Sequence, residues 1–333
     1  MGSAAEGRGA DVRGGGAIDT RPESTWEWLI DRRAARDRAL TRVLPYRIGI
    51  TSRPDGTWSD YVHHEVLYDL PAVVADVMER DISQRDLQHY RRAHHLAGFY
   101  GLLTDRVADG QVFQDRALER EAVWLRREWE SALSIACNSG AKARRWIADE
   151  RRLWKLAVST PCAQIDAPST YGKLVRDKVG HLWLSSGMML DEFGANGATV
   201  AMLRDSFERV MIALQCHDDA ADQDEDRALR GASATDLLGV DASTLHATAA
   251  LLLREVATRP LPVKMRSWCE AMSAQAFSLI EPERSVAAGV GAALLTASIV
   301  GASVSEAAAT TGSPSPRARS ISATRSEQGG PLR

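Results

Sequence analysis

The spacing of apolar residues along this chain is that of helices. Apolar side chains recur mostly at intervals of three and four, and β-branched runs with two-residue alternation are scarce. Short breaks such as Gly194-Ala195-Asn196-Gly197 separate the apolar stretches. The pattern predicts an all-α protein, with helices at about 25–43, 60–80, 84–108, 112–137, 141–158, 170–191, 198–228, 243–257, 262–280 and 286–304.

Two of the helix starts carry a capping pattern. Ser24 is followed three positions later by Glu27, and Ser83 by Asp86. In such a pair the serine oxygen accepts from a free amide of the first turn, while the acidic side chain reaches back to the serine main chain. The sequence therefore predicts that helices begin at Ser24 and Ser83.

The composition changes at the two ends of the chain. Residues 1–22 are rich in Gly, Ala, Asp and Arg and lack the continuous apolar stretch of a secretory signal, so we expect a disordered leader. From residue 306 onward Ala, Ser, Thr, Pro and Arg dominate, and such a segment buries too little apolar area to offset the entropy of ordering. We expect one α-helical domain at 23–305 and a disordered tail at 306–333.

Charge and cysteine usage narrow the function classes. The net charge of −3, from 41 basic and 44 acidic residues, gives no global field that would attract nucleic acid. The four cysteines form no CxxC pair, which indicates reduced thiols in a cytoplasmic protein rather than a zinc site or a disulfide framework. Segment 285–305 carries no charge, but Ala, Gly, Ser and Thr dominate it, which favours a packed helix over stable membrane insertion.

A cluster of aspartates follows an apolar helix. The run from Phe207 to Leu214 is apolar on more than one side and leads into the cluster. Side chains four apart share a helix face, so Asp218, Asp222 and Asp226 form a line of carboxylates, with Asp219 beside it. A solvated acidic helix end is one interpretation. Clustered aspartates after a buried helix favour the other, which is metal or phosphate binding.

An earlier helix ends in the same way. An apolar run leads into Asp105 and Asp109, one turn apart, just before Gly110. Mg²⁺ prefers a few carboxylates plus phosphate and water to an all-protein cage. Facing each other across a cavity, the two acidic helix ends would hold several Mg²⁺ ions bridged by substrate phosphates.

The histidines and tryptophans point to no site of their own. The members of each adjacent pair, His63-His64 and His94-His95, would point in different directions on a helix, which does not match the i, i+4 spacing of zinc ligands. We expect surface or core histidines, with His217 more ambiguous because it lies inside the acidic segment. The nine tryptophans are expected to pack in the core, and none is assigned to a cavity.

Four segments together resemble the class I isoprenoid synthase superfamily. Gln215 to Asp222 reads QxxDDxxD and resembles the second aspartate-rich motif of trans-prenyl diphosphate synthases. Lys178-Val179-Gly180-His181-Leu182 resembles the KTGxL segment that precedes this motif, and Asp105 to Asp109 falls where the first motif lies. Asp222 to Leu238 is similar to the DWEEDxxxGxxTxLL continuation of some bacterial class I enzymes. The resemblance covers roughly residues 80–240.

The departures from this family bear on the reaction. Arg106 stands where chain-elongating synthases have a second aspartate, and the resulting DxxxD pattern is closer to squalene and phytoene synthases and to some terpene cyclases. We find neither the NSE-type triad of common bacterial cyclases nor the glycine-lysine-arginine segment of elongating enzymes. The resemblance therefore implies ionisation followed by cyclisation, rearrangement or a single coupling rather than chain elongation.

By resemblance, the fold would be a helical bundle around a central cavity, with more than one Mg²⁺ ion as cofactor. Arg106 has two open interpretations, an ion pair with Asp109 or contact with phosphate oxygens. The implied catalytic residues are Asp105, Asp109, Asp218 and Asp222. The implied metal ligands are Asp105, Asp109, Asp218, Asp219, Asp222 and Asp226. The candidate diphosphate-binding residues are Lys178 from its motif and, from proximity, Arg106, Arg227, Lys173 and Gln215.

The function implied by the resemblance is that of a terpene synthase, a carbon–oxygen lyase that ionises a linear prenyl diphosphate with Mg²⁺, cyclises or rearranges the cation and releases pyrophosphate. The alternative is a prenyltransferase that joins the allylic cation to a second substrate, as prenyl diphosphate synthases and squalene or phytoene synthases do. A hypothesis from another class is a helical regulator or scaffold in which Arg106 marks a lost metal site. Relatives often form dimers, so a homodimer is the oligomeric state to test.

Overall fold

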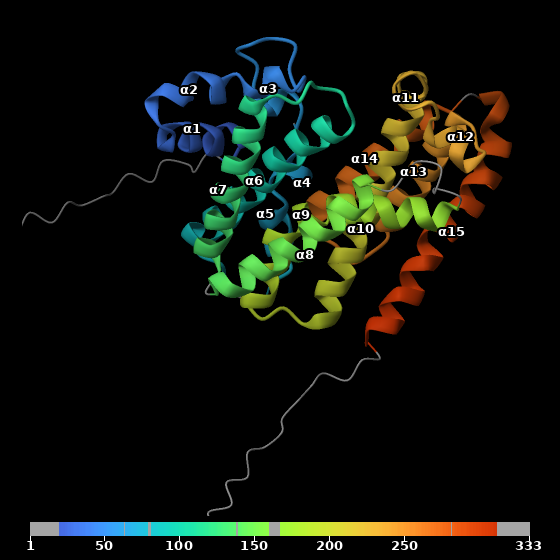
Figure 1. Cartoon of the computed structure of the whole chain (residues 1–333). Helices are drawn as coiled ribbons and strands as arrows, with labels where there is room; N and C mark the ends of the chain where they lie inside the picture. Colours follow the sequence, from blue (N-terminus) through green and yellow to red (C-terminus); the bar gives the residue numbers. More distant parts are fainter. Residues whose placement is uncertain are drawn as a thin grey trace, which may run out of the picture.

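The structure, a computed structural model, describes residues 20–62, 64–78, 81–137, 139–159, 167–280 and 282–311, and of 301–311 only the main chain (Figure 1). Within these residues every regular element is a helix and there is no strand, which confirms the all-α prediction. Most of the predicted leader and of the predicted tail, at 1–19 and 312–333, lies outside the described residues.

In its first half, the described part of the chain contains eight α-helices and a 3₁₀ turn, η1, at Trp58–Asp60. The helices are α1 (Pro22–Arg32), α2 (Ala35–Arg42), α3 (Leu44–Arg47), α4 (Glu65–Tyr68), α5 (Leu70–Ala75), α6 (Gln84–Ala108), α7 (Arg116–Ala136) and α8 (Gly140–Ser159).

The second half begins with the long central helix and ends with a helix of small residues that a 3₁₀ turn, η3, at Pro282–Arg284 precedes. Its helices are α9 (Pro168–Glu192), α10 (Gly197–Ala221), α11 (Gln223–Arg230), α12 (Ala234–Leu238), α13 (Ala242–Ala257), α14 (Val263–Ser278) and α15 (Ser285–Thr311).

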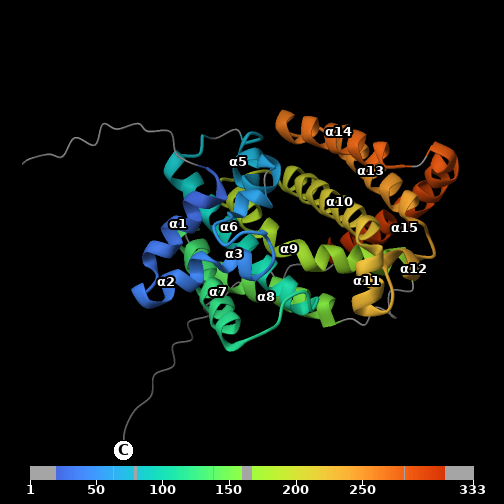
Figure 2. The ribbon, with the colours of Figure 1, turned by 90° about the horizontal axis from the view of Figure 1, so that it is seen from above.

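Helix α9 lies at the centre of the bundle. It packs against α5, α6, α8, α10 and α15, while α10 packs against α13, and α13 against α14 and α15 (Figure 2). Helices α1 to α3 lie at one end of the molecule and α11 and α12 at the other (Figures 1 and 2). The central position of α9 brings Lys178 between the ends of α6 and α10.

The sequence-based boundaries hold best for the long helices. The helices predicted at 84–108, 141–158, 170–191, 243–257 and 262–280 correspond to α6, α8, α9, α13 and α14 within two residues at each end. The cap predicted at Ser83 is confirmed, because the Ser83 hydroxyl accepts from the Asp86 amide. The helix predicted at 112–137 starts later, at Arg116, because the Asp115 carboxylate caps it by accepting from the Leu118 amide.

The prediction at 25–43 is wrong. The chain forms two helices, α1 and α2, because Arg33 adopts an extended conformation between them. The predicted cap at Ser24 is also wrong, since Ser24 lies inside α1 and donates its hydroxyl to the Arg21 carbonyl. Pro22 starts the helix instead, where its fixed φ and missing N–H are tolerated.

The prediction at 60–80 fails for a similar reason. The chain forms η1, α4 and α5 there, and α5 opens with Leu70-Pro71. Proline cannot donate the hydrogen bond that would continue a preceding helix, so the short α4 ends before it. Residues 63, 79 and 80 lie outside the described part of the chain.

The helix predicted at 198–228 bends at Asp222, where φ is −98° and ψ is 13°. Hydrogen bonds from the Asp222 amide to the Asp218 carbonyl and from the Asp226 amide to the Asp222 carbonyl are kept. The break between α10 and α11 is therefore a kink, and Asp226 still follows Asp222 by one turn. At the C-terminal side, α15 runs to Thr311, beyond the predicted end at 304 and into the predicted tail.

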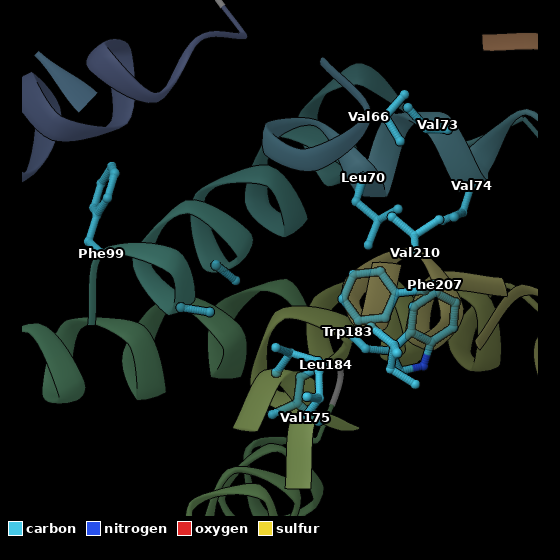
Figure 3. Packing of buried hydrophobic residues seen from close by; sticks show 14 of the residues in the cluster. Val66, Leu70, Val73, Val74, Phe99, Val175, Trp183, Leu184, Phe207 and Val210 are labelled. Carbon is cyan, nitrogen blue, oxygen red and sulfur yellow. The ribbon is translucent and has the colours of Figure 1, made fainter. Parts of the chain in front are cut away.

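Apolar packing sets the separation of the helices that carry the acidic segments. Leu70 and Val74 of α5 face Phe207 and Val210 of α10, with Trp183 of α9 beneath them (Figure 3). The Trp183 and Phe207 rings lie 5.7 Å apart at an angle of 34°. Burial of each such side chain stabilises the folded state by about 1.5–3 kcal/mol. This packing holds α9 against α10 just ahead of the site.

Helix α15 packs in the bundle, as expected for segment 285–305. Ala288, Ala292, Leu295 and Ile299 are buried, on the side where α15 meets α9 and α13. Across the described ranges, no helix combines the length and the apolar character needed to cross a membrane. Of the four cysteines, Cys137, Cys216 and Cys269 are free and buried, and Cys162 lies outside the described residues.

Candidate functional site

A cavity of about 380 Å³ lies between α6, α9 and α10. Its volume falls in the range of small-molecule sites. Most of its wall is apolar, from Leu102 of α6, Leu182 of α9 and Met211 of α10 among others, while Asp105 and Asp218 bring carboxylates to it. Such a lining suits a ligand with a long apolar part and a charged end.

Asp105 and Asp109 share one ammonium group at the end of α6. The Lys178 Nζ atom lies 2.7 Å from Asp105 Oδ1 and 3.5 Å from Asp109 Oδ2. Burial raises the pKa of Asp105, and Lys178 opposes this rise. Burial lowers the pKa of Lys178, but the two carboxylates outweigh it and the pKa is raised, so the ammonium group stays charged. The structure thus brings together three residues predicted from two separate motifs.

Asp218, on α10, interacts electrostatically with the same lysine, Lys178. It lines the cavity, and burial followed by the charge of Asp222 raises its pKa, with Arg106 and Lys178 opposing. Arg106 extends toward Tyr61, whose ring centre lies 5.9 Å from the guanidinium carbon. Among the described residues no ion pair joins Arg106 to Asp109. Of the two interpretations of Arg106, the geometry therefore favours contact with phosphate oxygens over an ion pair with Asp109.

Arg230 links the two acidic segments, and the sequence reasoning missed it. Its guanidinium lies 3.1 Å from Asp109 Oδ2 and 3.5 Å from Asp226 Oδ1. A signal was present in the sequence, because Arg230 follows Asp226 by four positions and therefore shares its helix face. The chain of ion pairs runs from Asp105 through Lys178, Asp109 and Arg230 to Asp226.

Asp219 has a different environment from its neighbour Asp218. It is buried, and its two oxygens accept hydrogen bonds at 2.7 Å from the Tyr171 hydroxyl and from Gln215 Nε2. Burial raises the pKa of Asp219 to about 6. Because both oxygens are engaged, the geometry gives Asp219 the role of joining α9 to α10. Gln215 lines the cavity while its amide group supports Asp219.

Three of the predicted residues lie on the exposed surface. Arg227 pairs with Asp236 at 2.8 Å, and Lys173 with Asp177 at 2.6 Å. Neither cation lines the cavity. Asp222 is exposed at the kink after α10, close enough to Asp218 to raise the pKa of that carboxyl. Arg227 and Lys173 are close to the motifs in sequence, but they lie on the solvent-exposed faces of their helices.

The spacing of the carboxylates decides what kind of magnesium site they can form. Within the described ranges no three His, Cys, Asp or Glu side chains come close enough to hold a metal ion by themselves. Lys178 and Arg230 lie between the carboxylates instead. Mg²⁺ needs only one or two carboxylates plus phosphate and water. The donor set therefore fits a magnesium ion that is shared with a phosphate ligand, and not an all-protein cage.

Two histidines of the cavity wall, His94 and His95, hold their rings against main-chain carbonyl oxygens. The two ring nitrogens of His94 lie 2.6 Å from the Leu67 carbonyl oxygen and 3.1 Å from that of Leu182. His95 Nε2 lies 2.7 Å from the Tyr68 carbonyl oxygen. Trp154, which was expected to pack in the core, lines the wall of the cavity.

Comparisons of the chain with protein-family models, with curated proteins and with solved structures found no match.

Proposed function

We propose that this protein is a class I terpene synthase-like enzyme, which ionises a linear prenyl diphosphate and cyclises or rearranges the cation with release of pyrophosphate. The observation that carries the proposal is the convergence of two acidic helix ends, from α6 and from α10 with α11, on Lys178 and Arg230 beside a largely apolar cavity. The motif resemblance predicts this arrangement, and the cavity supplies room for an apolar chain.

Four carboxylates, those of Asp105, Asp109, Asp218 and Asp226, would hold magnesium at the diphosphate. When bound there, magnesium neutralises the charge that develops on the leaving group as its C–O bond breaks. Asp222, exposed one turn after Asp218, remains a predicted ligand.

Lys178 and Arg230 add positive charge to the same place. Each lies within 3.5 Å of two carboxylates, so each can exchange one ion pair for a phosphate oxygen without crossing the site. Arg106, beside Tyr61 and Asp218, is the third cation at this end of the cavity.

The apolar wall protects the cation that remains after diphosphate leaves. Leu102, Leu182 and Met211 keep water away from it. Phe207 and Trp154 also line the cavity, and aromatic rings attract positive charge through their π electrons. The wall therefore supports a reaction that proceeds through a carbocation.

The test measures pyrophosphate release from geranyl, farnesyl and geranylgeranyl diphosphates, each with and without Mg²⁺, with mass analysis of the organic extract. We expect magnesium-dependent release with at least one substrate and a hydrocarbon or alcohol formed from that substrate alone. A coupled product when isopentenyl diphosphate or a second prenyl diphosphate is added would assign the protein to the prenyltransferases. No release under any condition contradicts the proposal and favours the helical regulator or scaffold.

A further inference from the structure

Tyr61 reaches the cavity from a segment outside the three helices that form most of its wall. It follows the turn η1, and its main-chain amide donates to the Trp58 carbonyl at 3.1 Å. Trp58 is fully buried, and its ring is stacked on that of Phe99 of α6, with the ring centres 4.3 Å apart. The turn therefore fastens Tyr61 to the helix that ends in the aspartates of the site.

The hydroxyl end of Tyr61 lies among the charged groups of the site. The Arg106 guanidinium donates a hydrogen bond to the hydroxyl oxygen, and its carbon lies 5.9 Å from the ring centre. Burial of the hydroxyl, followed by the charge of Asp218, raises the pKa of Tyr61, and Asp105 acts in the same direction. The phenol therefore keeps its proton near neutral pH. The residue as a whole is 44% exposed, so it stands where the cavity meets solvent.

Arg106 differs from the other two cations at this end of the cavity. Lys178 and Arg230 each contact two carboxylates, so an incoming anion must compete for them. Arg106 forms no ion pair within the described ranges, and its guanidinium is held by the Tyr61 hydroxyl. That hydroxyl accepts from Arg106, and in the part of the chain that the structure describes no group accepts its proton. The pair thus presents a guanidinium and an O–H group to an anion without the loss of an ion pair.

We propose that Tyr61 is a further diphosphate-binding residue, which donates its hydroxyl proton to a phosphate oxygen that Arg106 also contacts. The assignment rests on the proposed function for the identity of the ligand. A hydrogen bond to an ionised oxygen is shorter and stronger than one between neutral groups. The guanidinium that donates to the hydroxyl oxygen polarises the O–H bond and strengthens it as a donor. The phenol takes part in no covalent step and stays protonated while it binds the anion.

Tyr68 provides a matched comparison, because it lines the same cavity but its hydroxyl has other neighbours. Burial, followed by the charges of Glu65 and Asp69, raises the pKa of Tyr68, and neither Arg106 nor an aspartate of the site acts on it. The two tyrosines therefore separate a hydroxyl at the charged end of the cavity from one that lies away from it. Loss of the Tyr68 hydroxyl should leave the binding of an anion at the charged end unchanged.

The test is a calorimetric titration of inorganic pyrophosphate, with Mg²⁺, into the parent chain, Tyr61→Phe, Tyr68→Phe, Arg106→Gln and the double variant of Tyr61→Phe with Arg106→Gln. Circular dichroism confirms folding, and phenylalanine keeps the ring of either tyrosine in place. We expect Tyr61→Phe to weaken pyrophosphate binding about tenfold or more, the effect of losing one hydrogen bond to a charged group. Tyr68→Phe should bind within about twofold of the parent.

The double variant tests whether the two groups act together. Because the hydroxyl and the guanidinium contact one phosphate oxygen, the loss of binding free energy in the double variant should be smaller than the sum of the two single losses. The Michaelis constant for the prenyl diphosphate that the parent uses should rise in Tyr61→Phe by about the same factor as the dissociation constant for pyrophosphate, about tenfold or more.

Each contrary outcome has a separate meaning. If the parent releases pyrophosphate from a prenyl diphosphate but Tyr61→Phe binds pyrophosphate as tightly as the parent, the assignment is overturned and the proposed function stands. Single losses that add in the double variant also overturn it, because the two groups would then bind separately. A parent that binds pyrophosphate through Tyr61 but releases none overturns the proposed function and leaves Tyr61 in an anion site. A parent that neither binds nor releases pyrophosphate overturns both.

Discussion

At the end of α6, Asp105 and Asp109 share a single ammonium group, that of Lys178, whereas at the end of α10 the aspartates have separate environments. Asp218 lines the cavity, Asp219 is buried between Tyr171 and Gln215, and Asp222 is exposed at the kink. Residues four apart share a helix face and adjacent residues do not. In an acidic segment, therefore, only the carboxylates on the helix face that points toward the cavity can bind a ligand.

The largest effect is expected for the cavity carboxylate of α10. Asp218→Asn keeps the shape of the side chain but removes its charge, so pyrophosphate release should fall about a hundredfold to a thousandfold, the cost of losing one electrostatic partner of a developing charge. Asp224→Asn is the matched control, because the Asp224 side chain is 92% exposed in the same acidic segment. Its rate should stay within about twofold of the parent. Equal losses in the two variants would show that total charge matters and helical phase does not.

Removal of the shared ammonium group tests the end of α6. Lys178→Met leaves Asp105 and Asp109 without their common partner, and the free energy of unfolding in urea should fall by about 2–3 kcal/mol. Lys173→Met removes a lysine of the same helix whose ion pair with Asp177 is on the surface, and it should cost less than about 0.5 kcal/mol. A Lys178 variant as stable as the Lys173 variant contradicts the role of Lys178 as the link between α6 and α9.

The pH dependence of stability tests the state of His181, a residue of α9 in the cavity wall whose pKa is lowered by burial. The pKa of this ring is held at about 4 in the folded protein, against about 6.5 in an unfolded chain. Between these values the unfolded state binds more protons, so folding stability is lost as the pH falls. From about pH 7.5 to about pH 5 the parent should lose about 2 kcal/mol more unfolding free energy than His181→Gln. Parallel curves for the two proteins would mean that the ring titrates normally and is exposed to water.

The smallest effect concerns the inward-facing carboxylate of α10. Tyr171→Phe removes one of the two hydrogen bonds to Asp219, and the unfolding free energy should fall by about 1 kcal/mol. Pyrophosphate release, measured on the folded fraction, should change far less than in Asp218→Asn. A loss of release as large as that of Asp218→Asn would place Tyr171 and Asp219 at the diphosphate.

Much of the fold could be predicted from the pattern of apolar residues, since the long helices α6, α8 and α9 begin and end close to their predicted limits. The misses lie where a single main-chain feature overrides periodicity. Arg33 is extended between α1 and α2, and Pro71 separates α4 from α5. The cap predicted at Ser24 is wrong because α1 begins at Pro22, about one turn earlier.

The site was predictable to the extent that helical phase could be read from the sequence. Asp105 and Asp109 lie on one face, and the structure brings Lys178 to both. Arg230 could have been predicted in the same way, because it follows Asp226 by four residues and shares its helix face. The place of His181 in the cavity wall could not be predicted, because its ring packs against Gly101 of another helix, and a contact between two helices is not encoded in the spacing of residues along either one.

The central claim is that the carboxylates of α6 and α10 form one magnesium and diphosphate site. The most direct test is a calorimetric titration of inorganic pyrophosphate into the parent chain and into Asp105→Asn with Asp218→Asn, with and without Mg²⁺. Binding to the parent only when Mg²⁺ is present, and its loss in the double variant, is the result we predict. Binding that needs no Mg²⁺, or that the double variant retains, would contradict the claim.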